Sequence, residues 1–491
     1  MNTPLPEGKA RGKSPSLAGL RSLFKKAKSP ELPERTSGKG SPSLAALLSF
    51  VWPGLGQLYA GKRRIAAIFA VPVLLVLLLL AYALRRGPVI LAVQLFADRA
   101  VGLITLAIII VVGVWRLASV VHAYTRPGLS HSHKVIDRAV VAVLVVAIVV
   151  SHASAGYLLA LSSNAGSQVF NSIADSSLID QPTVAPSDSA SMASSTPDPT
   201  LPPPLIDGRV TILLTGVDSD PTRSEHLYDT IMVVSYDSHT NSVQMVSVPR
   251  DSASFPFYFG GVDKASVRIN SLPTYVRNGW IKSPDSPYLT LVKEVSYLVG
   301  IPINYYAVMD FVGFSKMIDA VGGIDVNNPK VVNDPTYVLA PNKFGFYLAA
   351  GTQHLDSMHA LAYVRSRHGS SDWSRSARQQ LVLQALARKM AQPNELLALP
   401  SIISAVGKSV VTTFPSEKLA DYVSIAMAVP SKNFSSVVLG PPYTITGINS
   451  LNSASTTCLI NYRVAALSIK LFGKDSLWYG KRTPANTCPA N

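Results

Sequence analysis

Four arginines, one aspartate and two glutamines gather in residues 361–380, LAYVRSRHGSSDWSRSARQQ. We interpret this stretch as a strand, a loop and the start of a helix. Residues two apart share a face of a strand, which aligns Arg365 with Arg367; residues four apart share a face of a helix, which aligns Arg375 with Gln379. Guanidinium groups on converging elements suit phosphate oxygens, because charge-assisted bonds are about twice as strong as neutral ones. The stretch predicts a cationic phosphate pocket, with a solvated basic helix start as the alternative.

Three further charged sites lie at the ends of apolar runs that we interpret as strands. Asp218 follows VTILLTGV, Asp229 precedes TIMVVSYD, and Arg250 with Asp251 closes SVQMVSVP. Open α/β sheets place their ligands beside strand ends, which would bring these side chains together. Carboxylates are hard oxygen ligands, and Mg²⁺ usually takes one or two of them together with substrate phosphates. Asp218 and Asp229 are therefore candidate metal ligands, with ordinary turn chemistry as the alternative.

Apolar runs in the N-terminal part of the 491-residue chain predict membrane helices. Residues 65–84 carry no charge over about the twenty residues that a helix needs to cross the hydrocarbon core. A second run covers residues 101–123 and a third residues 139–161, so we expect three crossings. Arg116 interrupts the second run. It either snorkels to the interface or lies beyond a span that begins earlier, near Pro88.

The basic residues beside these runs predict the orientation of the chain. Lys and Arg recur before residue 40 and at positions 62–64, and such residues are retained on the cytoplasmic side. We therefore expect a multi-pass plasma-membrane protein with a cytoplasmic N-terminus and everything after residue 161 outside the cell. Residues 43–61, broken by Pro and Gly, are interpreted as interfacial or re-entrant. The first apolar run starts too far from Met1 for a cleaved signal peptide.

The net charge of +15 does not by itself indicate nucleic-acid binding. Much of the charge lies in the basic tail and beside the membrane runs, where topology explains it. A basic face on a soluble domain would be needed before DNA or RNA became the expected partner. The partner that the composition does predict is the membrane.

Composition divides the chain into five parts. They are a basic cytoplasmic tail, a membrane region, a Ser- and Pro-rich spacer, an α/β domain and a C-terminal extension, at residues 1–42, 43–161, 162–208, 209–440 and 441–491. The spacer cannot bury enough apolar surface to order itself. In the α/β domain, strand and helix patterns alternate. The extension gives no clear element, and its Cys458 and Cys488 lie on the expected outer side, where disulfides form, although the sequence leaves their pairing open.

Within the α/β domain, the turn residues between the second and third strands predict a hairpin. Later elements are expected as helices at residues 289–298, 313–321 and from 372 toward 390, and as strands at 305–309 and 435–440.

Six blocks in the order TGVDSD, YDTIMVVS, VSVPRDS, MDFVGFSKMIDAVGGIDV, LAYVRSRHG and DWSRSARQQLVL resemble the LytR-CpsA-Psr (LCP) family of membrane-anchored cell-wall ligases. The resemblance covers residues 210–440. It implies a three-layer α/β/α domain with a long apolar pocket for a polyprenyl chain and a pyrophosphate-binding mouth. It further implies transfer of a glycan phosphate from a polyprenyl-pyrophosphate carrier to peptidoglycan, assisted by Mg²⁺ or Mn²⁺.

Carried over block by block, the resemblance assigns roles to particular residues. The metal-binding aspartates fall on Asp218 and Asp229, and the Pro-Arg-Asp arginine falls on Arg250. The paired arginines fall on Arg365 and Arg367, and the helix arginine and glutamine fall on Arg375 and Gln379, with Arg378 beside them as a further candidate for substrate binding.

Two positions depart from the family pattern. The family usually has Arg-Ser-Asp-Thr before the second strand, but here residues 225–228 separate Arg223-Ser224 from Asp229, so Arg223 is not assigned a role. The family's Lys-Ile-Asn appears as Arg268-Ile269-Asn270, with Lys264 four residues earlier, and either cation could bind substrate. Asp251 is a candidate general base, with an ion pair to Arg250 as the alternative.

The chemistry of the predicted substrate agrees with these residue types. A pyrophosphate diester carries about two negative charges that repel an attacking hydroxyl until cations neutralise the oxygens, so catalysis is largely electrostatic positioning. Two other functions need much the same pocket. One is a non-catalytic module that binds polyprenyl phosphates or wall polymers and regulates; the other is simple pyrophosphate hydrolysis.

Overall fold

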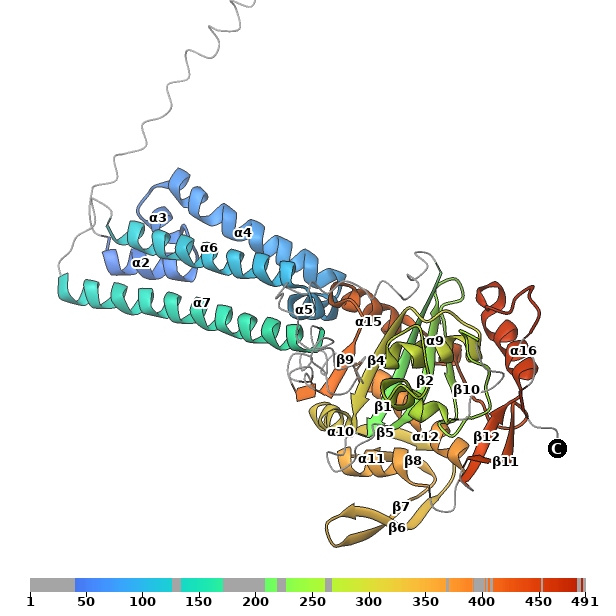
Figure 1. Cartoon of the computed structure of the whole chain (residues 1–491). Coiled ribbons are helices and arrows are strands. Elements are labelled where there is room, and N and C mark those ends of the chain that lie inside the picture. Colours follow the sequence, from blue (N-terminus) through green and yellow to red (C-terminus); the bar gives the residue numbers. More distant parts are fainter. Residues whose placement is uncertain are drawn as a thin grey trace, which may run out of the picture. The chain divides into compact units, whose positions relative to one another are not determined.

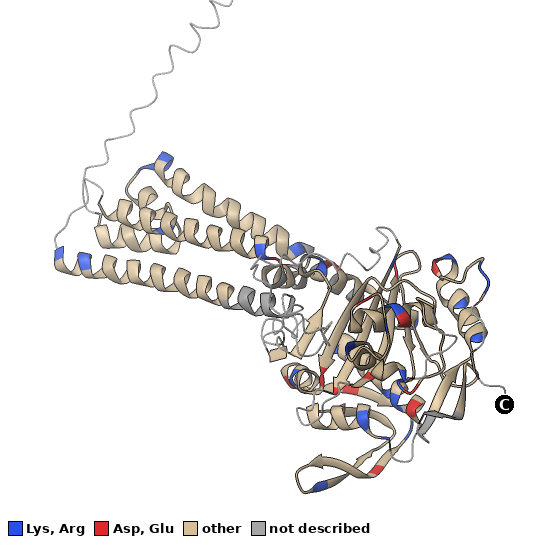
Figure 2. Ribbon diagram, viewed as in Figure 1, with Lys and Arg blue, Asp and Glu red and all other residues tan. Residues whose placement is uncertain are grey.

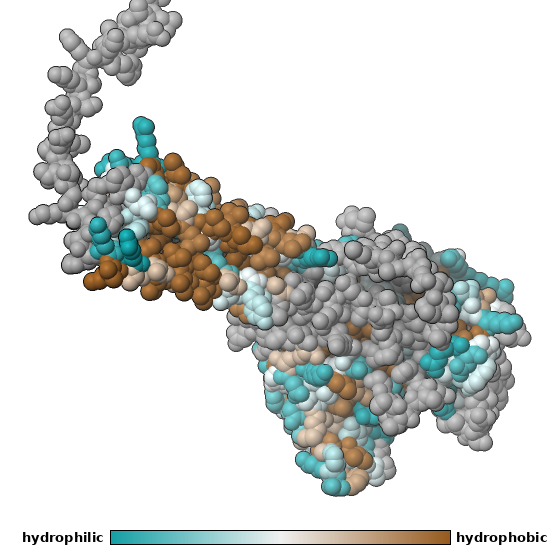
Figure 3. Space-filling model, turned by 60° about the vertical axis from the view of Figure 1, so that its left-hand side comes forward, coloured by the Kyte–Doolittle hydropathy of each residue, from teal (hydrophilic) through white to brown (hydrophobic). Residues whose placement is uncertain are grey.

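A computed structural model of the chain describes residues 40–125, 134–170, 208–218, 227–260, 267–367, 371–390, 409–451 and 454–483, with short pieces at 392, 402, 405–406 and 487–488. Three of its helices are long and apolar enough to cross a membrane: α4 (Arg63–Arg86), α6 (Arg99–Tyr124) and α7 (Lys134–Phe170). Brown hydrophobic residues dominate the surface of this helical region (Figure 3), where leucines such as Leu79 are exposed. The three predicted crossings therefore coincide with helices.

Residues 42–59 form two short helices, α2 (Pro42–Val51) and α3 (Leu55–Tyr59), which polar contacts attach to α6. The Gln57 amide donates to the Ser119 carbonyl at 2.8 Å and accepts from the Ser49 hydroxyl at 3.0 Å. Arg116 donates to the Phe50 carbonyl at 2.8 Å. Because α6 includes Arg116 and α5 (Pro88–Ala97) is a separate helix, the expectation of a span that starts near Pro88 and ends before Arg116 is wrong.

The later part of the chain is organised around a six-stranded mixed sheet. Strand β1 pairs antiparallel with β2 and parallel with β4, so the carboxyl ends of β1, β3 and β4 share one edge with the start of β2. Across the sheet the order is β10 (Phe434–Val438), β3 (Ser242–Ser247), β2 (Leu227–Asp237), β1 (Arg209–Asp218), β4 (Tyr305–Asp310) and β9 (Val410–Thr412). The predicted hairpin between β2 and β3 is confirmed, as are the strands at 305–309 and 435–440.

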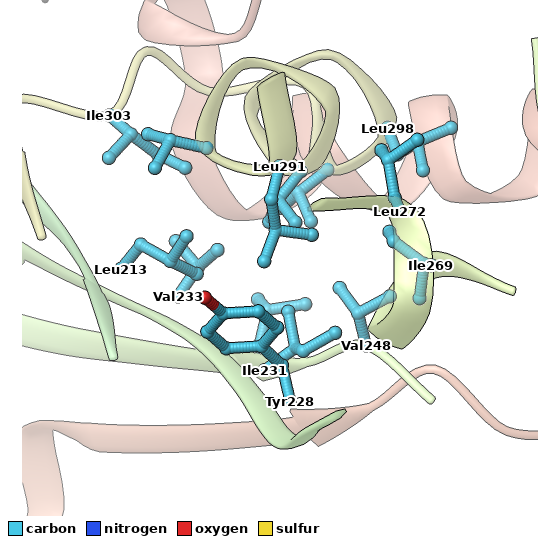
Figure 4. Close-up of a cluster of buried hydrophobic side chains, with 14 of the residues drawn as sticks. Leu213, Tyr228, Ile231, Val233, Val248, Ile269, Leu272, Leu291, Leu298 and Ile303 are labelled. Carbon is cyan, nitrogen blue, oxygen red and sulfur yellow. The ribbon is translucent and has the colours of Figure 1, made fainter. Parts of the chain in front are cut away.

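Helices cover both faces of this sheet, which makes the predicted three-layer α/β/α domain (Figure 1). On one face, Leu213 and Ile231 pack against Leu291 of α9 (Pro287–Val299), beside the shorter α8 (Leu272–Arg277), as Figure 4 shows. On the other face, Leu383 of α12 (Asp372–Met390) packs against Met232. The same part of the chain also contains the helices α10 (Phe311–Ala320) and α15 (Leu419–Ala428).

A second hydrophobic core joins α10, α12 and α11 (Ser357–Arg365) to two small sheets. One sheet pairs β5 (Ile324–Asn328) with β8 (Gly351–Leu355), and the other pairs β6 (Val332–Ala340) with β7 (Lys343–Leu348). The predicted strand that begins at residue 361 is wrong, because this segment is the end of α11. The Asp356 carboxylate caps this helix by accepting the His359 amide at 2.8 Å.

The C-terminal extension, for which the sequence predicts no clear element, contains regular secondary structure in its described residues. It contains the hairpin β11 (Thr444–Leu451) and β12 (Ala454–Leu459), followed by α16 (Asn461–Phe472). Cys458 and Cys488 form a disulfide that ties the end of the chain to β12. The backbone of β12 also contacts the α/β domain, since the Ala253 amide donates to the Thr457 carbonyl at 2.8 Å.

Candidate functional site

A β-bulge places the first two candidate carboxylates at one end of the β1–β2 ladder. Gly216 pairs with Thr230 and Val217 with Tyr228, so Asp229 is the extra residue of β2. Bulges re-aim side chains beside functional sites. Asp218 ends β1 at the same edge and is buried. The prediction that Asp218 and Asp229 lie at a common sheet edge is therefore matched by the backbone.

Arg250 and Asp251 follow β3 at this same edge, and Arg250 is held by carboxylates. Its guanidinium donates to Asp229 in a short hydrogen bond and lies 3.7 Å from Asp251 and 3.9 Å from Asp372. Asp251 also approaches Arg268 at 3.6 Å. The ion pair expected as the alternative role of Asp251 is thus present, while its role as a general base stays a prediction.

The helix α12 brings two more charged residues to Arg250. Arg375, whose side chain is 4% exposed, lies 3.0 Å from Asp372 and donates to the Asp229 backbone carbonyl at 3.3 Å. Arg367, half exposed after α11, lies 3.6 Å from Asp372 and 3.9 Å from Asp251. We call the connected set the charged cluster: Asp229, Arg250, Asp251, Arg268, Arg367, Asp372 and Arg375.

Asp372 is the member of the charged cluster to which the sequence reasoning assigned no role. As the first residue of α12 it places a negative charge at the positive end of the helix dipole, and it touches three guanidinium groups. The signal was available, because Asp372 is the only carboxylate among the four arginines of residues 361–380. An acid that precedes an arginine by three residues at a helix start would have pointed to it.

The two most buried arginines of the charged cluster, Arg250 and Arg375, have pKa values shifted in opposite directions. Burial alone lowers the pKa of Arg250, but the carboxylates of Asp229, Asp251 and Asp372 outweigh it and raise the pKa above the ordinary value. Burial lowers the pKa of Arg375, and the neighbouring Arg250 lowers it further. Arg375 therefore carries a positive charge that its surroundings only partly compensate, as an anion site requires.

Arg268 reaches the charged cluster through backbone bonds that join two segments. The Ile269 amide donates to the Ser252 carbonyl at 2.8 Å, and the Asn270 amide donates to the Arg250 carbonyl at 3.3 Å. This pairing places Arg268 beside Asp251, and its role as a substrate-binding cation stays a prediction. Lys264, the other candidate, lies outside the described residues.

Arg365 does not share a face with Arg367. It is the last residue of α11, and the backbone leaves the helix at Ser366, where ψ is 133°, so Arg367 lies on the segment beyond the helix. Its guanidinium lies over the Phe311 ring, 4.3 Å from the ring centroid. The predicted pairing of two strand arginines is wrong; Arg367 enters the charged cluster and Arg365 stacks on α10.

Arg378 and Gln379 also separate. Arg378 is buried, donates to the Tyr363 carbonyl at 2.7 Å and makes a short bond to the Ser366 carbonyl, so it holds the end of α11 rather than lying in the charged cluster. This finding differs from the substrate contact expected of Arg378. Gln379 donates to the Val364 carbonyl at 3.4 Å and lines a cavity, and its contact with substrate stays a prediction.

An apolar cavity of about 170 Å³ lies between the sheet and helices α10 and α12. Its walls include Met309, Phe314 and Val382, and its polar border contains Thr230 and Gln379. Thr230 directly follows Asp229, and Gln379 lies one helical turn after Arg375, so the cavity adjoins the charged cluster. Phe311, the ring beneath Arg365, also lines it. We call it the apolar cavity.

Gly216 is a glycine for a reason of space at this border. A Cβ there would lie 3.0 Å from the Thr230 hydroxyl oxygen. The residue lines the apolar cavity next to the bulge that carries Asp229. A side chain at this position would push against β2 where the cavity and the charged cluster meet.

The donor set fits a cation that takes most of its ligands from elsewhere. Among the described residues, no group of three or more His, Cys, Asp or Glu side chains could hold a metal ion. Two carboxylates, Asp218 and Asp229, remain at the sheet edge as hard oxygen donors. Mg²⁺ needs only one or two protein carboxylates when substrate phosphates and water complete its shell. The residues are therefore compatible with Mg²⁺ or Mn²⁺ bound together with a phosphate ligand.

Fold and site define a class: an α/β protein with a cluster of arginines and carboxylates beside an apolar cavity, in a chain that also has three helices long and apolar enough to cross a membrane. A sequence model described as the LytR_cpsA_psr family matches residues 178–457, more than half of the chain. The chain belongs to the LytR-CpsA-Psr family, as the six blocks indicated.

Two curated relatives show the extent of the similarity. "Polyisoprenyl-teichoic acid--peptidoglycan teichoic acid transferase TagU" of Bacillus mycoides is 33% identical over 217 residues, covering 43% of this chain and 62% of the relative. "Regulatory protein MsrR" of Staphylococcus aureus is 33% identical over 213 residues, covering 43% and 58%. The chain thus spans less than two thirds of the length of either relative. Among solved structures, TagV of B. subtilis aligns with a TM-score of 0.44 and 23% identity, covering 55% of this chain and 98% of that one.

Proposed function

We propose that the protein is a phosphotransferase that moves a glycan phosphate from a polyprenyl-pyrophosphate-linked precursor to peptidoglycan. One observation carries the proposal: two residues that line the apolar cavity adjoin members of the charged cluster, since Thr230 directly follows Asp229 and Gln379 lies one helical turn after Arg375. A ligand that fits both regions has a doubly charged headgroup and an apolar tail. The name of the Bacillus mycoides relative, a polyisoprenyl-teichoic acid transferase acting on peptidoglycan, describes such a donor and acceptor.

The charged cluster suits the pyrophosphate of this donor. Arg250, Arg367 and Arg375 come from three segments of the chain. Each guanidinium lies within ion-pair distance of Asp251 or Asp372. These carboxylates orient the guanidinium groups before a ligand arrives, which reduces the reorganisation needed during reaction. Bidentate bonds from arginine to phosphate oxygens then add geometric selection to charge.

The reaction that we propose is displacement at the glycan-bearing phosphorus. A hydroxyl oxygen of the acceptor forms a new bond to this phosphorus, the bond to the bridging oxygen breaks, and polyprenyl phosphate leaves with the electron pair. The hydroxyl proton passes to a base, for which Asp251 is the candidate, or to solvent. Arg250 and Arg375 stabilise the charge that develops on the phosphoryl oxygens.

A divalent cation completes the proposed site. Asp218 and Asp229 would hold Mg²⁺ or Mn²⁺ at the β1–β2 edge, and the cation would supply Lewis-acid polarisation of the phosphoryl oxygens. The short bond from Arg250 to Asp229 links the cation-binding side of the site to the guanidinium side. Asp229 therefore serves to orient Arg250 as well as to offer an oxygen.

The proposed location follows from charge and length. Three apolar helices and a basic N-terminal region support a multi-pass plasma-membrane protein with a cytoplasmic N-terminus. An odd number of crossings puts the α/β domain outside the cell, where peptidoglycan lies. The Cys458–Cys488 disulfide agrees with an oxidising compartment.

The proposal is tested with the full chain in lipid nanodiscs, a polyprenyl-pyrophosphate-linked glycan labelled at the glycan-side phosphate, and peptidoglycan fragments. We expect labelled phosphodiester-linked glycan on the acceptor by mass spectrometry, with polyprenyl phosphate released in equal amount and chelator abolishing both. Release of free glycan phosphate with no acceptor product would indicate hydrolysis instead. Donor binding that ignores chelator and yields no product would favour a regulatory binder, the role named for the Staphylococcus aureus relative.

A further inference from the structure

The C-terminal extension, residues 441–491, carries a net positive charge. Residues 441–491 contain five basic residues and Asp475 as the sole acid. Asp475 already forms an ion pair, because its carboxylate lies 2.9 Å from Arg209 at the start of β1. The basic residues are all exposed: Arg463, Lys470, Lys474, Lys481 and Arg482. Figure 2 shows blue positions along the segment labelled α16 in Figure 1.

The extension is attached to the segment that carries the charged cluster. Thr457 of β12 exchanges backbone hydrogen bonds with both sides of Ser252, donating to the Asp251 carbonyl at 3.0 Å and accepting from the Ala253 amide at 2.8 Å. The Ile460 amide, just before α16, donates to the Tyr443 carbonyl at 2.8 Å. Backbone hydrogen bonds therefore connect the Asp251 segment to β12, which leads directly into α16.

A groove runs along the exposed side of α16. It is shallow and open to solvent, has a volume of about 490 Å³ and is lined by Pro442, Tyr443, Arg463, Ala466, Leu467 and Lys470. Positions 463, 466 and 470 follow the spacing of one helix face, so two cations flank a small alanine floor. Arg463 donates to the Pro442 carbonyl at 2.7 Å, which fixes its guanidinium at the groove wall. Within the described residues, no ion pair joins Arg463 or Lys470 to a carboxylate.

We propose that this groove binds the polymer part of the donor, a chain of negatively charged repeats such as phosphodiesters. The inference rests on the proposed function, since it extends the same donor from the charged cluster onto the extension. Repeating anions match cations spaced along a helix, and a groove with Tyr443 and Pro442 as walls holds a chain rather than a flat surface. The polymer contacts add to affinity without touching the reacting phosphorus, so the groove selects donors by charge and length.

The test measures binding of a soluble probe, fluorescent poly(glycerol phosphate), to the full chain in phosphatidylcholine nanodiscs. We expect binding that weakens with salt and falls about tenfold in Arg463→Gln/Lys470→Gln, with neutral dextran bound by neither protein. Lys470→Gln alone retains the Arg463 contact to Pro442, so it reports the charge if the double variant is unstable; we expect a loss of about threefold. Polymer affinity equal to wild type in both variants would overturn the inference.

Matched controls separate this groove from other sources of binding. Lys282→Gln/Lys330→Gln removes two exposed charges elsewhere in the α/β domain and is expected to leave polymer binding unchanged; an equal loss there would overturn the inference. So would loss of binding to vesicles with one quarter phosphatidylglycerol in Arg463→Gln/Lys470→Gln while polymer binding persists, because the groove would then serve a lipid surface. Wild-type transfer from a donor without polymer is measured in parallel; its failure would sink the proposed function and leave the binding result standing.

Discussion

The charged cluster and the apolar cavity adjoin each other and share elements, yet they are built by opposite rules. Helix α12 gives Arg375 to the first and Val382 to the second, two turns apart. In the cluster every described carboxylate has a guanidinium partner, and side chains are fixed by ion pairs. In the apolar cavity, side chains such as Met309 make only non-directional contacts, so the shape of the cavity confines a ligand.

This difference teaches where selectivity and affinity come from. Oriented cations discriminate a pyrophosphate from a neutral headgroup, because leaving them unpaired or mispaired is costly in a partly buried site. Apolar surface contributes about 25 cal/mol per Å² and cannot tell one hydrocarbon from another beyond its length and width. The headgroup should therefore determine turnover, and the tail should determine donor affinity.

The largest effect is expected from breaking the charged cluster. Arg250→Ala removes the group that joins three carboxylates, so we predict that kcat for transfer falls by about 10²–10³, the usual loss for one preorganised charge-stabilising donor. Donor KM should change much less, because the tail still occupies the cavity. Steady-state kinetics with the full-length donor measure both values.

Arg250→Lys is the matched control for this change. It keeps the positive charge but loses the planar fork that reaches several oxygens, so an intermediate kcat is expected. Equal kcat in wild type, Arg250→Lys and Arg250→Ala, with unchanged melting temperatures, would mean that the charged cluster does not take part in the reaction.

A second change sharpens the comparison by filling the apolar cavity. Met309→Trp adds volume to its wall and displaces part of the tail; losing the burial of two to three CH₂ groups costs about 2 kcal/mol of donor binding, roughly 30-fold. We predict a rise in KM of that order for a long polyprenyl donor and a small change in kcat. A donor with a single isoprene unit should be affected little. If both donors lose equally, the cavity does not hold the tail.

Asp372→Asn should have a smaller effect. The amide keeps the shape of the carboxylate but removes the charge that orients Arg367 and Arg375. We predict that kcat falls about tenfold, equivalent to about 1.4 kcal/mol of transition-state stabilisation. Added external anions should not restore it, because positioning rather than charge balance is lost. A kcat within twofold of wild type would show that Asp372 is dispensable.

Glu294 offers a carboxylate without the partners found in the charged cluster. It is fully buried on α9, accepts the Tyr258 amide at 3.2 Å, and among the described residues no cation pairs with it. Burial raises its pKa to about 8 from 4.5. Its folded form thus holds a proton that the unfolded chain releases near pH 4.5, so the stability that this proton contributes is complete below pH 4.5 and is lost as the pH rises to 8.

Replacing Glu294 removes this pH dependence and should leave transfer nearly unchanged. We predict that Glu294→Gln matches wild type in stability at pH 5 and exceeds it by pH 8, by on the order of a few kcal/mol. Thermal melts of both proteins across this range check the prediction. Parallel melting curves for the two proteins at every pH would show that Glu294 carries no elevated pKa.

The sequence was informative where local pattern and site chemistry coincide. Apolar runs located the strand that ends at Asp218 and the strand that precedes Arg250, because alternation and length indicate strands well. It failed at residues 361–365, where a short apolar run fits strand and helix equally, and only the capping residue Asp356 favours a helix. The bulge at Asp229 left no sequence signal, because it depends on how β1 and β2 pair. The elements of the C-terminal extension could not be predicted, because contacts to Ser252 and a disulfide, which have no periodic pattern in the sequence, stabilise its hairpin.

One measurement tests most directly whether a single ligand spans both regions: an experimental structure of the full chain in nanodiscs with a non-hydrolysable polyprenyl pyrophosphate analogue and Mg²⁺. We predict that the phosphates lie among Arg250, Arg367 and Arg375, and that the first isoprene units pass Thr230 and Gln379 into the apolar cavity. Phosphates bound away from these arginines, or a tail that leaves the cavity empty, would contradict the account.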